Sequence, residues 1–285
     1  MNKTILVAGK YMPEAGSFTD GIAFSGRQII VSGLRSDSEE TKKLTIAERK
    51  AKQSAYEEEK AQEAKSGICT IEWNKSSPLS ARSLVLQTSS IFGRMDEAVL
   101  YFDEEWYASK AEKMDSEEIV RGCDEMIAGY QYLALEVLNS FKRRDTEDGP
   151  GTLVFLLKDT PNQLDVLYNP AQKNGLSPIA SPVVASGAAS FAAFAENLAA
   201  VCQDSIFVNV VLIRGDSNME GFRRDDETGR WLCSYLDSEE GSPKAPENRA
   251  KVKWIRPGAT RPAVSEPEAE TPASRPGKKF GLFRR

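Results

Sequence analysis

The sequence of 285 residues contains no histidine. Catalysis by Ser-His-Asp or Cys-His groups therefore lacks its base, and zinc sites built on imidazole are excluded. Serines in the apolar stretch 181–190 have no base partner for the same reason. The absence of one residue type removes several common classes of hydrolase and metalloenzyme.

Cysteine is also scarce. The four cysteines are far apart in the sequence and show no CxxC spacing: Cys69, Cys123, Cys202 and Cys233. Most of them stand among apolar residues, which favours reduced core residues over disulfides or metal ligands. No spacing is typical of a metal-binding loop, and we predict no metal site.

Long apolar runs and a targeting segment are missing as well. The start, MNKTILVAGK, becomes polar too early for a signal peptide. No apolar run reaches the roughly 20 residues that a membrane span needs. We therefore expect a cytoplasmic protein.

Charge is unevenly distributed along the chain. The net charge is −5, but residues 241–285 hold 11 Lys and Arg against 4 Asp and Glu, so this +7 segment leaves about −12 for residues 1–240. Nucleic-acid binding needs a basic face, and the acidic body argues against it.

The segment 241–285 differs in composition from the rest. It holds seven of the 14 prolines and few large apolar residues, which predicts a disordered tail. The tail closes on GKKFGLFRR, and we interpret this end as a docking motif for an acidic or apolar protein partner. A weak contact with an anionic membrane and an inert basic terminus are the alternatives. The motif residues are Phe280, Leu282, Phe283, Arg284 and Arg285.

The body alternates apolar strands with helices. Strands are predicted at 3–9, 27–35, 67–73, 96–104, 151–159 and 205–215, and helices at 79–93, 115–144 and 183–202. Near-continuously apolar strands alternating with helices indicate a doubly wound parallel sheet, a Rossmann-like three-layer α/β/α domain over residues 1–240. The charged stretch 36–65 is predicted to be a solvated helical excursion, with a partner-binding arm as the alternative.

Two of the predicted helices are apolar over more than one face. The helix within 115–144 carries a wide apolar stripe, and 183–202 is apolar almost all round. The core covers one side of each helix, so a partner is expected on the other. We predict a homodimer, or a heterodimer with a related subunit.

Several segments together resemble the short-chain dehydrogenase/reductase family, over roughly residues 3–236. These segments are TILVAG, GRQIIVSGLR, DEAVLYF, GTLVFLL and ENLAAVCQDSIFVNVVLIRG. The resemblance implies a Rossmann fold that binds NAD(P). It also implies an Asn-Ser-Tyr-Lys tetrad, in which the tyrosine is the acid/base and the lysine lowers its pKa.

The residues that would hold the cofactor are only partly matched. The family's first turn resembles T-G-x-x-x-G-x-G, and here it reads AGKYMPEA, so Gly9 matches while Pro13 and Ala15 replace the other glycines. Arg35 is a candidate for binding a 2′-phosphate, or else a surface arginine. Residues 100–103 read LYFD where the family has small residues, and their bulk is expected to fill the adenine side as core. The sequence predicts no bound cofactor, with NAD(P) as the alternative.

The catalytic positions are not matched. The family's asparagine, serine, tyrosine and lysine fall on Met126, Lys158, Val184 and Ala188. Valine and alanine carry no proton, and loss of an acid/base alone slows a reaction by about 10²–10⁴-fold. Lys158, at a strand end, is also a weak candidate for binding an anion.

The sequence therefore favours a non-catalytic pseudoenzyme that serves as a binding, scaffold or regulatory protein. The alternative is an NAD(P)-dependent oxidoreductase in which Tyr101, Tyr130, Tyr168 or Lys158 substitutes for the tetrad, and a third reading is a metabolite sensor. Carboxylate pairs are expected on solvated faces; they occur at Asp103/Glu104, Glu117/Glu118, Asp124/Glu125 and Asp225/Asp226.

Overall fold

The computed structural model describes residues 2–34, 63, 65–111, 115–144, 149–173, 175–238 and 252–257. Arg35, nearly all of the charged segment 36–65 and the motif at 280–285 lie outside these residues. The predictions made for those three parts of the chain therefore stay predictions.

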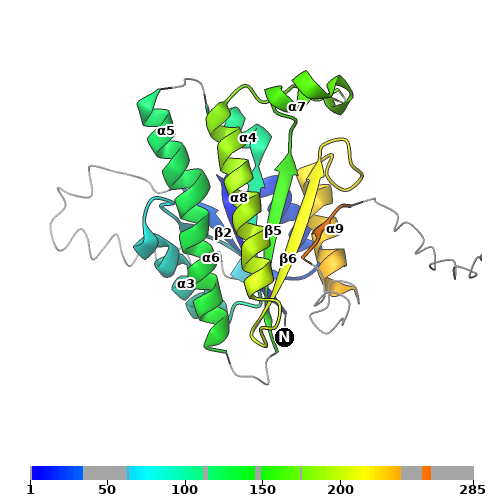
Figure 1. Ribbon diagram of the computed structural model, residues 1–285. Helices are drawn as coiled ribbons and strands as arrows, with labels where there is room; N and C mark the ends of the chain where they lie inside the picture. Colours follow the sequence, from blue (N-terminus) through cyan, green and yellow to red (C-terminus); the bar gives the residue numbers. More distant parts are fainter. Residues whose placement is uncertain are drawn as a thin grey trace, which may run out of the picture.

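A seven-stranded parallel sheet forms the centre of the molecule (Figure 1). Its order is β3-β2-β1-β4-β5-β6-β7, so the direction of winding reverses between β1 and β4. The six predicted strands are all present, and the doubly wound sheet is confirmed. The bounds are β1 Thr4–Met12, β2 Gln28–Gly33, β3 Ile68–Glu72, β4 Glu97–Asp103, β5 Gly151–Asp159, β6 Val208–Asp216 and β7 Trp254–Ile255.

Helices cover both faces of the sheet, as the apolar character of its strands requires. On one face α1 (Gly16–Ala23) and α9 (Asp225–Asp237) pack over a core that includes Phe18, Tyr101 and Phe222. On the other face α3 (Pro78–Phe92), α6 (Gly129–Lys142) and α8 (Pro182–Val201) enclose the larger core (Figure 1). These two cores give the three-layer α/β/α architecture.

The long helix predicted at 115–144 is present but interrupted. It consists of α5 (Ser116–Gly122), a π-helical turn at Cys123–Ala128, and α6. Asp115 caps its start by accepting from the amide of Glu118, as its acidic first turn suggests. Short helices α4 (Glu104–Ala108) and α7 (Gln163–Tyr168) follow the ends of β4 and β5, and a 3₁₀ turn lies at Pro170–Lys173.

Helix α8 buries one face against the sheet through Val184, Gly187, Ala188, Phe191, Ala195 and Ala199. At 20 residues it is long and apolar enough to cross a membrane by length and composition alone, which corrects the expectation that no run reaches this length. A helix buried in a core meets the same criterion, and α8 has such a buried face.

The last strand was not predicted. β7 pairs in parallel with β6, with Trp254 opposite Leu212 and Ile255 opposite Ile213. The predicted disorder of segment 241–285 therefore does not hold for residues 252–257. A two-residue strand in a basic, proline-containing stretch has too short a pattern to be recognised from sequence.

The cysteines divide into two groups. All four are free thiols; Cys69 and Cys233 are buried and Cys202 is half-buried, as expected of core residues. Cys123 is exposed at the start of the π-helical turn, which corrects the prediction for this residue.

Candidate functional site

Open α/β sheets bind ligands beyond the carboxyl ends of their strands, where the strand order reverses. In this protein that point lies between the ends of β1 and β4. Two groups of side chains meet there. One surrounds Lys75, and the other is a cluster of two lysines and two aspartates.

Lys75 stands in the loop between β3 and α3, and its side chain is almost fully buried, with 1% of the residue exposed. Its amine donates to the carbonyl oxygen of Gly9, at 2.8 Å, and to the hydroxyl of Tyr107, at 2.5 Å. Gly9 lies in β1 and Tyr107 in α4. One lysine thus joins three elements across the point where a ligand would enter.

Five aromatic rings surround the amine of Lys75, and we call them the aromatic cage. The distance from Nζ to a ring centroid is 4.6 Å for Tyr11 and 5.5 Å for Trp73 and Tyr130, with the other two between. Rings at such distances attract a cation through their electron-rich faces. The cage residues are Tyr11, Trp73, Trp106, Tyr107 and Tyr130.

Hydroxyl groups extend from the amine as a directed chain. The hydroxyl of Tyr130 donates its one proton to the carbonyl of Tyr101, at 2.7 Å, so it accepts from the hydroxyl of Tyr107, 3.0 Å away. Tyr107 in turn accepts from Lys75. When the amine of Lys75 is neutral, every N–H and O–H donor in this row of groups therefore has an acceptor inside the protein.

Burial shifts the pKa values of these groups. It lowers the pKa of Lys75 to about 7 and holds the pKa values of Tyr107 and Tyr130 well above 10. A neutral lysine amine keeps two N–H groups, and Lys75 donates two hydrogen bonds. The contacts of Lys75 therefore survive loss of its charge near neutral pH.

The second group lies at the ends of β1, β4 and β5 and the start of α9; we call it the charge cluster. Nζ of Lys10 is 2.6 Å from carboxylate oxygens of both Asp103 and Asp225, and Nζ of Lys158 is 3.0 Å from Asp225 and 3.7 Å from Asp103. The Tyr101 hydroxyl is within hydrogen-bonding distance of both carboxylates. The two positive and two negative charges balance within the cluster.

Charge pairing outweighs burial in this cluster. Burial alone would raise the pKa of Asp225, yet Lys10 and Lys158 lower it. Burial would likewise lower the pKa of Lys10, and the two aspartates raise it. Pairing thus favours the charged forms of Lys10 and Asp225, and Lys158 has two carboxylate partners of its own.

The expectation that carboxylate pairs are solvated is wrong at two of the four places. Asp103, Glu104 and Asp226 are buried, and Asp225 is bound in the charge cluster. Glu104 accepts from the amide of Thr160, and burial raises its pKa to about 8. Glu118 is buried as well. Asp103/Glu104 lie where β4 ends and α4 begins, and Asp225/Asp226 begin α9, both at the carboxyl-end edge of the sheet, which we call the ligand edge. Their positions in the chain, and not their composition, could have indicated that these carboxylates are buried.

Gly9 does not begin a phosphate-binding turn. β1 continues past it to Met12, and α1 starts only at Gly16. A Cβ atom on Gly9 would lie 1.9 Å from the carbonyl oxygen of Tyr101, so glycine here permits close packing on β4. The match of Gly9 to the family turn thus reflects packing of the backbone.

Of the four residues that the resemblance assigned to the tetrad, three are packed in the core and one is ion-paired. Met126, Val184 and Ala188 are buried in the core, and Lys158 belongs to the charge cluster. Of the proposed substitutes, Tyr101 and Tyr130 are buried with their hydroxyls bonded, while Tyr168 on α7 is 80% exposed. The structure does not bring these groups together as a tetrad.

Lys75, Lys10 and most of the aromatic cage were not predicted from the sequence. Trp73 directly follows β3, Lys75 lies three residues after its end, and Tyr11 is the penultimate residue of β1, so their places near strand carboxyl ends were a usable signal. Among the described residues, no group of three or more His, Cys, Asp or Glu is arranged to hold a metal ion.

No protein-family model and no curated protein matches this sequence. Solved structures do match it. A short-chain dehydrogenase from Mycobacterium smegmatis aligns with a TM-score of 0.56 and 17% identity, over 90% of this chain and 91% of that one. A putative short-chain dehydrogenase/reductase from Sinorhizobium meliloti aligns with a TM-score of 0.55 and 14% identity, over 90% and 95%.

A third structure, a short-chain dehydrogenase/reductase from Brucella melitensis, aligns with a TM-score of 0.52 and 14% identity, over 90% of this chain and 94% of that one. At such identities the likeness concerns the course of the backbone. The strand order, the helices on both faces and these alignments agree, and the chain has the Rossmann fold of the short-chain dehydrogenases/reductases.

Proposed function

We propose that this chain is a non-catalytic member of its fold class, which acts as a binding, scaffold or regulatory protein. The observation that supports the proposal is Lys75 within the aromatic cage, at the place where a dinucleotide would lie. A buried lysine, five rings and a bonded hydroxyl chain occupy the ligand edge of β1, β3 and β4.

The residues present do not fit NAD(P). A pyrophosphate needs free backbone N–H groups at the start of the first helix. Here the amide of Ala15 donates to Tyr11 and that of Gly16 to Pro13. Glu14 adds a negative charge beside them. The adenine side is filled by aromatic residues near the end of β4 and in α4.

An oxidoreductase with displaced residues finds little support in the same geometry. Lys158 is neutralised by Asp103 and Asp225, and the hydroxyls of Tyr101 and Tyr130 are bonded inside the core. Tyr168 has no described basic partner. A catalytic acid must reach a substrate, and none of these groups combines exposure with a helper lysine.

The test is a titration of NADH and NADPH against intrinsic tryptophan fluorescence. Trp73 and Trp106 belong to the aromatic cage, so a nucleotide that entered there would change their emission. We expect no saturable change up to millimolar nucleotide, and no oxidation of NADPH with carbonyl substrates. Saturable binding in the micromolar range would refute the proposal.

The proposed partner surface lies on the outer side of α5 and α6. Ile119 and Val120 on α5 and Leu135 on α6 are about half exposed, which is unusual for large apolar side chains on one helical unit. We propose that a second copy, or a related subunit, covers them. The segment at 280–285 remains our proposed docking motif, and a cytoplasmic location remains part of the proposal.

Sedimentation velocity tests the oligomer. Val120→Glu together with Leu135→Glu is expected to convert a dimer to a monomer at micromolar concentration, because each places a charge in the interface. The matched control is Leu164→Glu on α7, which is equally exposed but lies outside this surface. A monomeric wild-type chain, or a control variant that dissociates equally, would contradict the assignment.

A further inference from the structure

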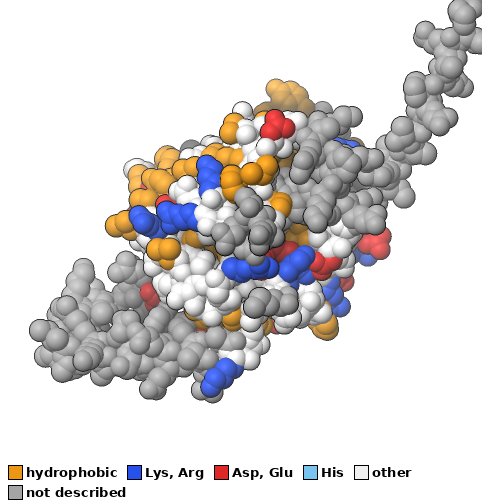
Figure 2. All heavy atoms as spheres, turned by 90° about the horizontal axis from the view of Figure 1, so that it is seen from below, with side chains coloured by type: hydrophobic (Ala, Val, Ile, Leu, Met, Phe, Trp, Pro, Cys, Tyr) orange, Lys and Arg blue, Asp and Glu red, His pale blue; other side chains and the backbone are white. Residues whose placement is uncertain are grey.

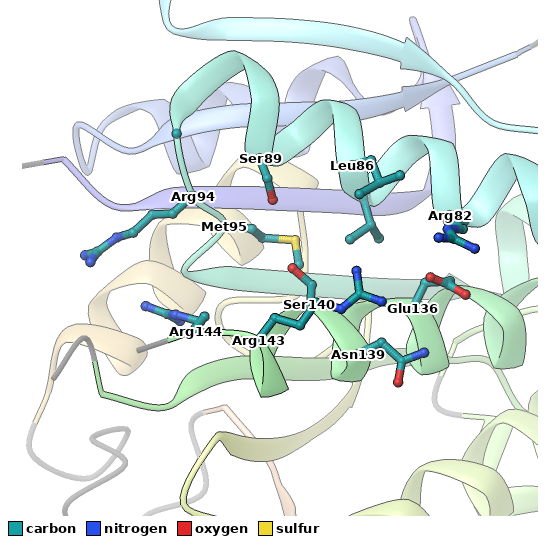
Figure 3. A pocket seen from close by; sticks show the side chains of 12 residues that line it. Arg82, Leu86, Ser89, Arg94, Met95, Glu136, Asn139, Ser140, Arg143 and Arg144 are labelled. Atoms are coloured by element: carbon teal, nitrogen blue, oxygen red, sulfur yellow. The ribbon is translucent and has the colours of Figure 1, made fainter. Parts of the chain in front are cut away.

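A cavity of about 340 Å³ lies between α3 and α6. Its lining includes residues that precede β4 and the end of α6 (Figure 3). It therefore lies at the amino ends of the strands, whereas Lys75 lies near their carboxyl ends. Its volume is at the lower end of the range for small-molecule sites. Nothing in the proposed function uses this cavity.

Arginine dominates the cavity wall. Arg82 comes from α3, Arg94 follows α3, and Arg143 and Arg144 follow α6; Glu136 is the one carboxylate in the lining. Figure 3 shows Arg94 and Arg144 side by side at one end of the cavity, Arg82 and Glu136 at the other, and Arg143 between them. In Figure 2, which looks at this edge of the sheet, Lys and Arg side chains are prominent on the surface.

Arg144 lines this cavity, and part of its guanidinium group is unpaired among the described residues. Its side chain is only 10% exposed, and Nη2 lies 3.2 Å from Oδ1 of Asp96. Its Nε and Nη1 atoms are buried without a hydrogen-bond partner in the described part of the chain. Asp96 is shared, since it also binds Nε of Arg94 at 2.8 Å. Leaving a neutral buried donor without a partner costs roughly 1–3 kcal/mol of stability, and an unpaired donor on a charged group costs more.

We propose that this cavity binds a small molecule that carries a phosphate group. A dianionic phosphate offers acceptors on several sides, and the planar guanidinium forks of arginine match it with paired hydrogen bonds. Four arginines against Glu136 and the shared Asp96 leave a net positive site on an acidic body. Val85, Leu86 and Met95 form an apolar part of the wall for the organic portion of the ligand.

The test uses isothermal titration calorimetry with glycerol 3-phosphate as the probe. Glycerol and sodium chloride at equal ionic strength are the controls for the organic part and for screening. Wild type is expected to bind glycerol 3-phosphate saturably at millimolar concentration or below, and glycerol not at all. Absence of saturable binding by wild type would overturn the proposal.

Three variants assign the binding to the cavity. Arg143→Gln is expected to weaken it about 10-fold, as the loss of one charge-assisted hydrogen bond predicts. Glu136→Gln removes the opposing charge and should strengthen it about 3-fold. Arg223→Gln, an exposed arginine outside the cavity, should leave it unchanged. Equal weakening by Arg223→Gln would show unspecific charge attraction and overturn the site.

One further arm separates a soluble ligand from a lipid headgroup. Vesicles that contain phosphatidic acid carry the same phosphate monoester on a flat surface, which a concave site cannot approach closely. Binding to vesicles without binding to glycerol 3-phosphate would contradict the proposal. Melting curves confirm that each variant is folded before titration.

Discussion

Nζ of Lys158 lies 3.0 Å from Oδ1 of Asp225, and the two residues are 67 positions apart in the sequence. This ion pair joins the end of β5 to the start of α9, beside the hydroxyl of Tyr101 on β4. Side-chain exposure is 9% for the lysine and 14% for the aspartate, so solvent screens the pair weakly. The charge cluster therefore ties the ligand edge of the sheet to its last helix.

Asp225→Asn should destabilise the protein by roughly 3 kcal/mol, because it leaves two buried lysines with one carboxylate. Adding Lys158→Met to this variant removes the single excess positive charge. The double variant should therefore lose about 1 kcal/mol less than the sum of the single variants. Urea unfolding of all four proteins at pH 7 measures the coupling, and strict additivity would show that the pair is not coupled.

Lys75 gives stability a distinctive pH dependence. Its pKa is about 7 in the folded protein and 10.5 when unperturbed, so between these values only the unfolded chain holds the proton. Stability from this group therefore rises with pH by about 1.4 kcal/mol per unit from pH 7.5 to 9.5. Lys75→Met lacks this slope. The unfolding free energy of wild type minus that of the variant should therefore increase across this window. A constant difference would show that Lys75 stays charged.

Glu104 gives a slope of the opposite sign. Burial raises its pKa from 4.5 to about 8, so the folded protein holds an extra proton between these values. The stability from Glu104 is complete below pH 4.5 and is lost as pH rises through 8. Glu104→Gln keeps an acceptor for the amide of Thr160. Chemical denaturation should show this variant gaining on wild type from pH 5 to pH 8, and parallel profiles would rule the shift out.

Gly9 supplies a test of backbone packing. Gly9→Ala would place Cβ 1.9 Å from the carbonyl oxygen of Tyr101, which forces β1 and β4 apart. We expect a loss of more than about 3 kcal/mol. Gly26→Ala is the control: its φ is +74°, but no atom stands within 4 Å of the added Cβ, so strain alone of about 1–2 kcal/mol applies. Thermal melting compares them, and equal losses would contradict the packing argument.

Truncation separates the last strand from the residues after it. A chain ending at residue 250 loses β7, including the hydrogen bond from Trp254 Nε1 to Glu196 and the contact of Arg214 with the Trp254 ring. Its melting temperature should fall by about 5 °C. A chain ending at residue 257 keeps β7 and should melt within a degree or two of the full chain. Equal melting of all three would show that β7 contributes nothing.

The apolar strands and their alternation with helices were sufficient to predict the sheet. Six strand positions and the helices at 79–93, 115–144 and 183–202 follow from local patterns, because strands buried on both faces must be apolar along their length. The predicted bounds agree with the structure to within a few residues at most ends. The same reading missed β7, whose two residues owe their pairing to β6.

The expectations about the catalytic positions came from residue types, whereas the contacts between the site residues depend on the tertiary structure. The sequence alone led to the prediction that Val184 and Ala188 stand where the resemblance implies a tyrosine and a lysine, and neither side chain moves a proton. The contacts of Lys75 with Gly9 and Tyr107 could not be predicted from the sequence, because only the order of the strands brings these residues together. Asp103 and Asp225 likewise looked like surface carboxylates until the fold placed two lysines between them.

The sequence by itself determined the architecture and the absence of histidine chemistry, because both depend on residue types and local periodicity. Tertiary structure alone decided which charges are buried together, that the ligand edge is filled, and that four arginines line one cavity. These properties depend on distances between residues far apart in the chain, and a linear pattern of residue types does not contain them.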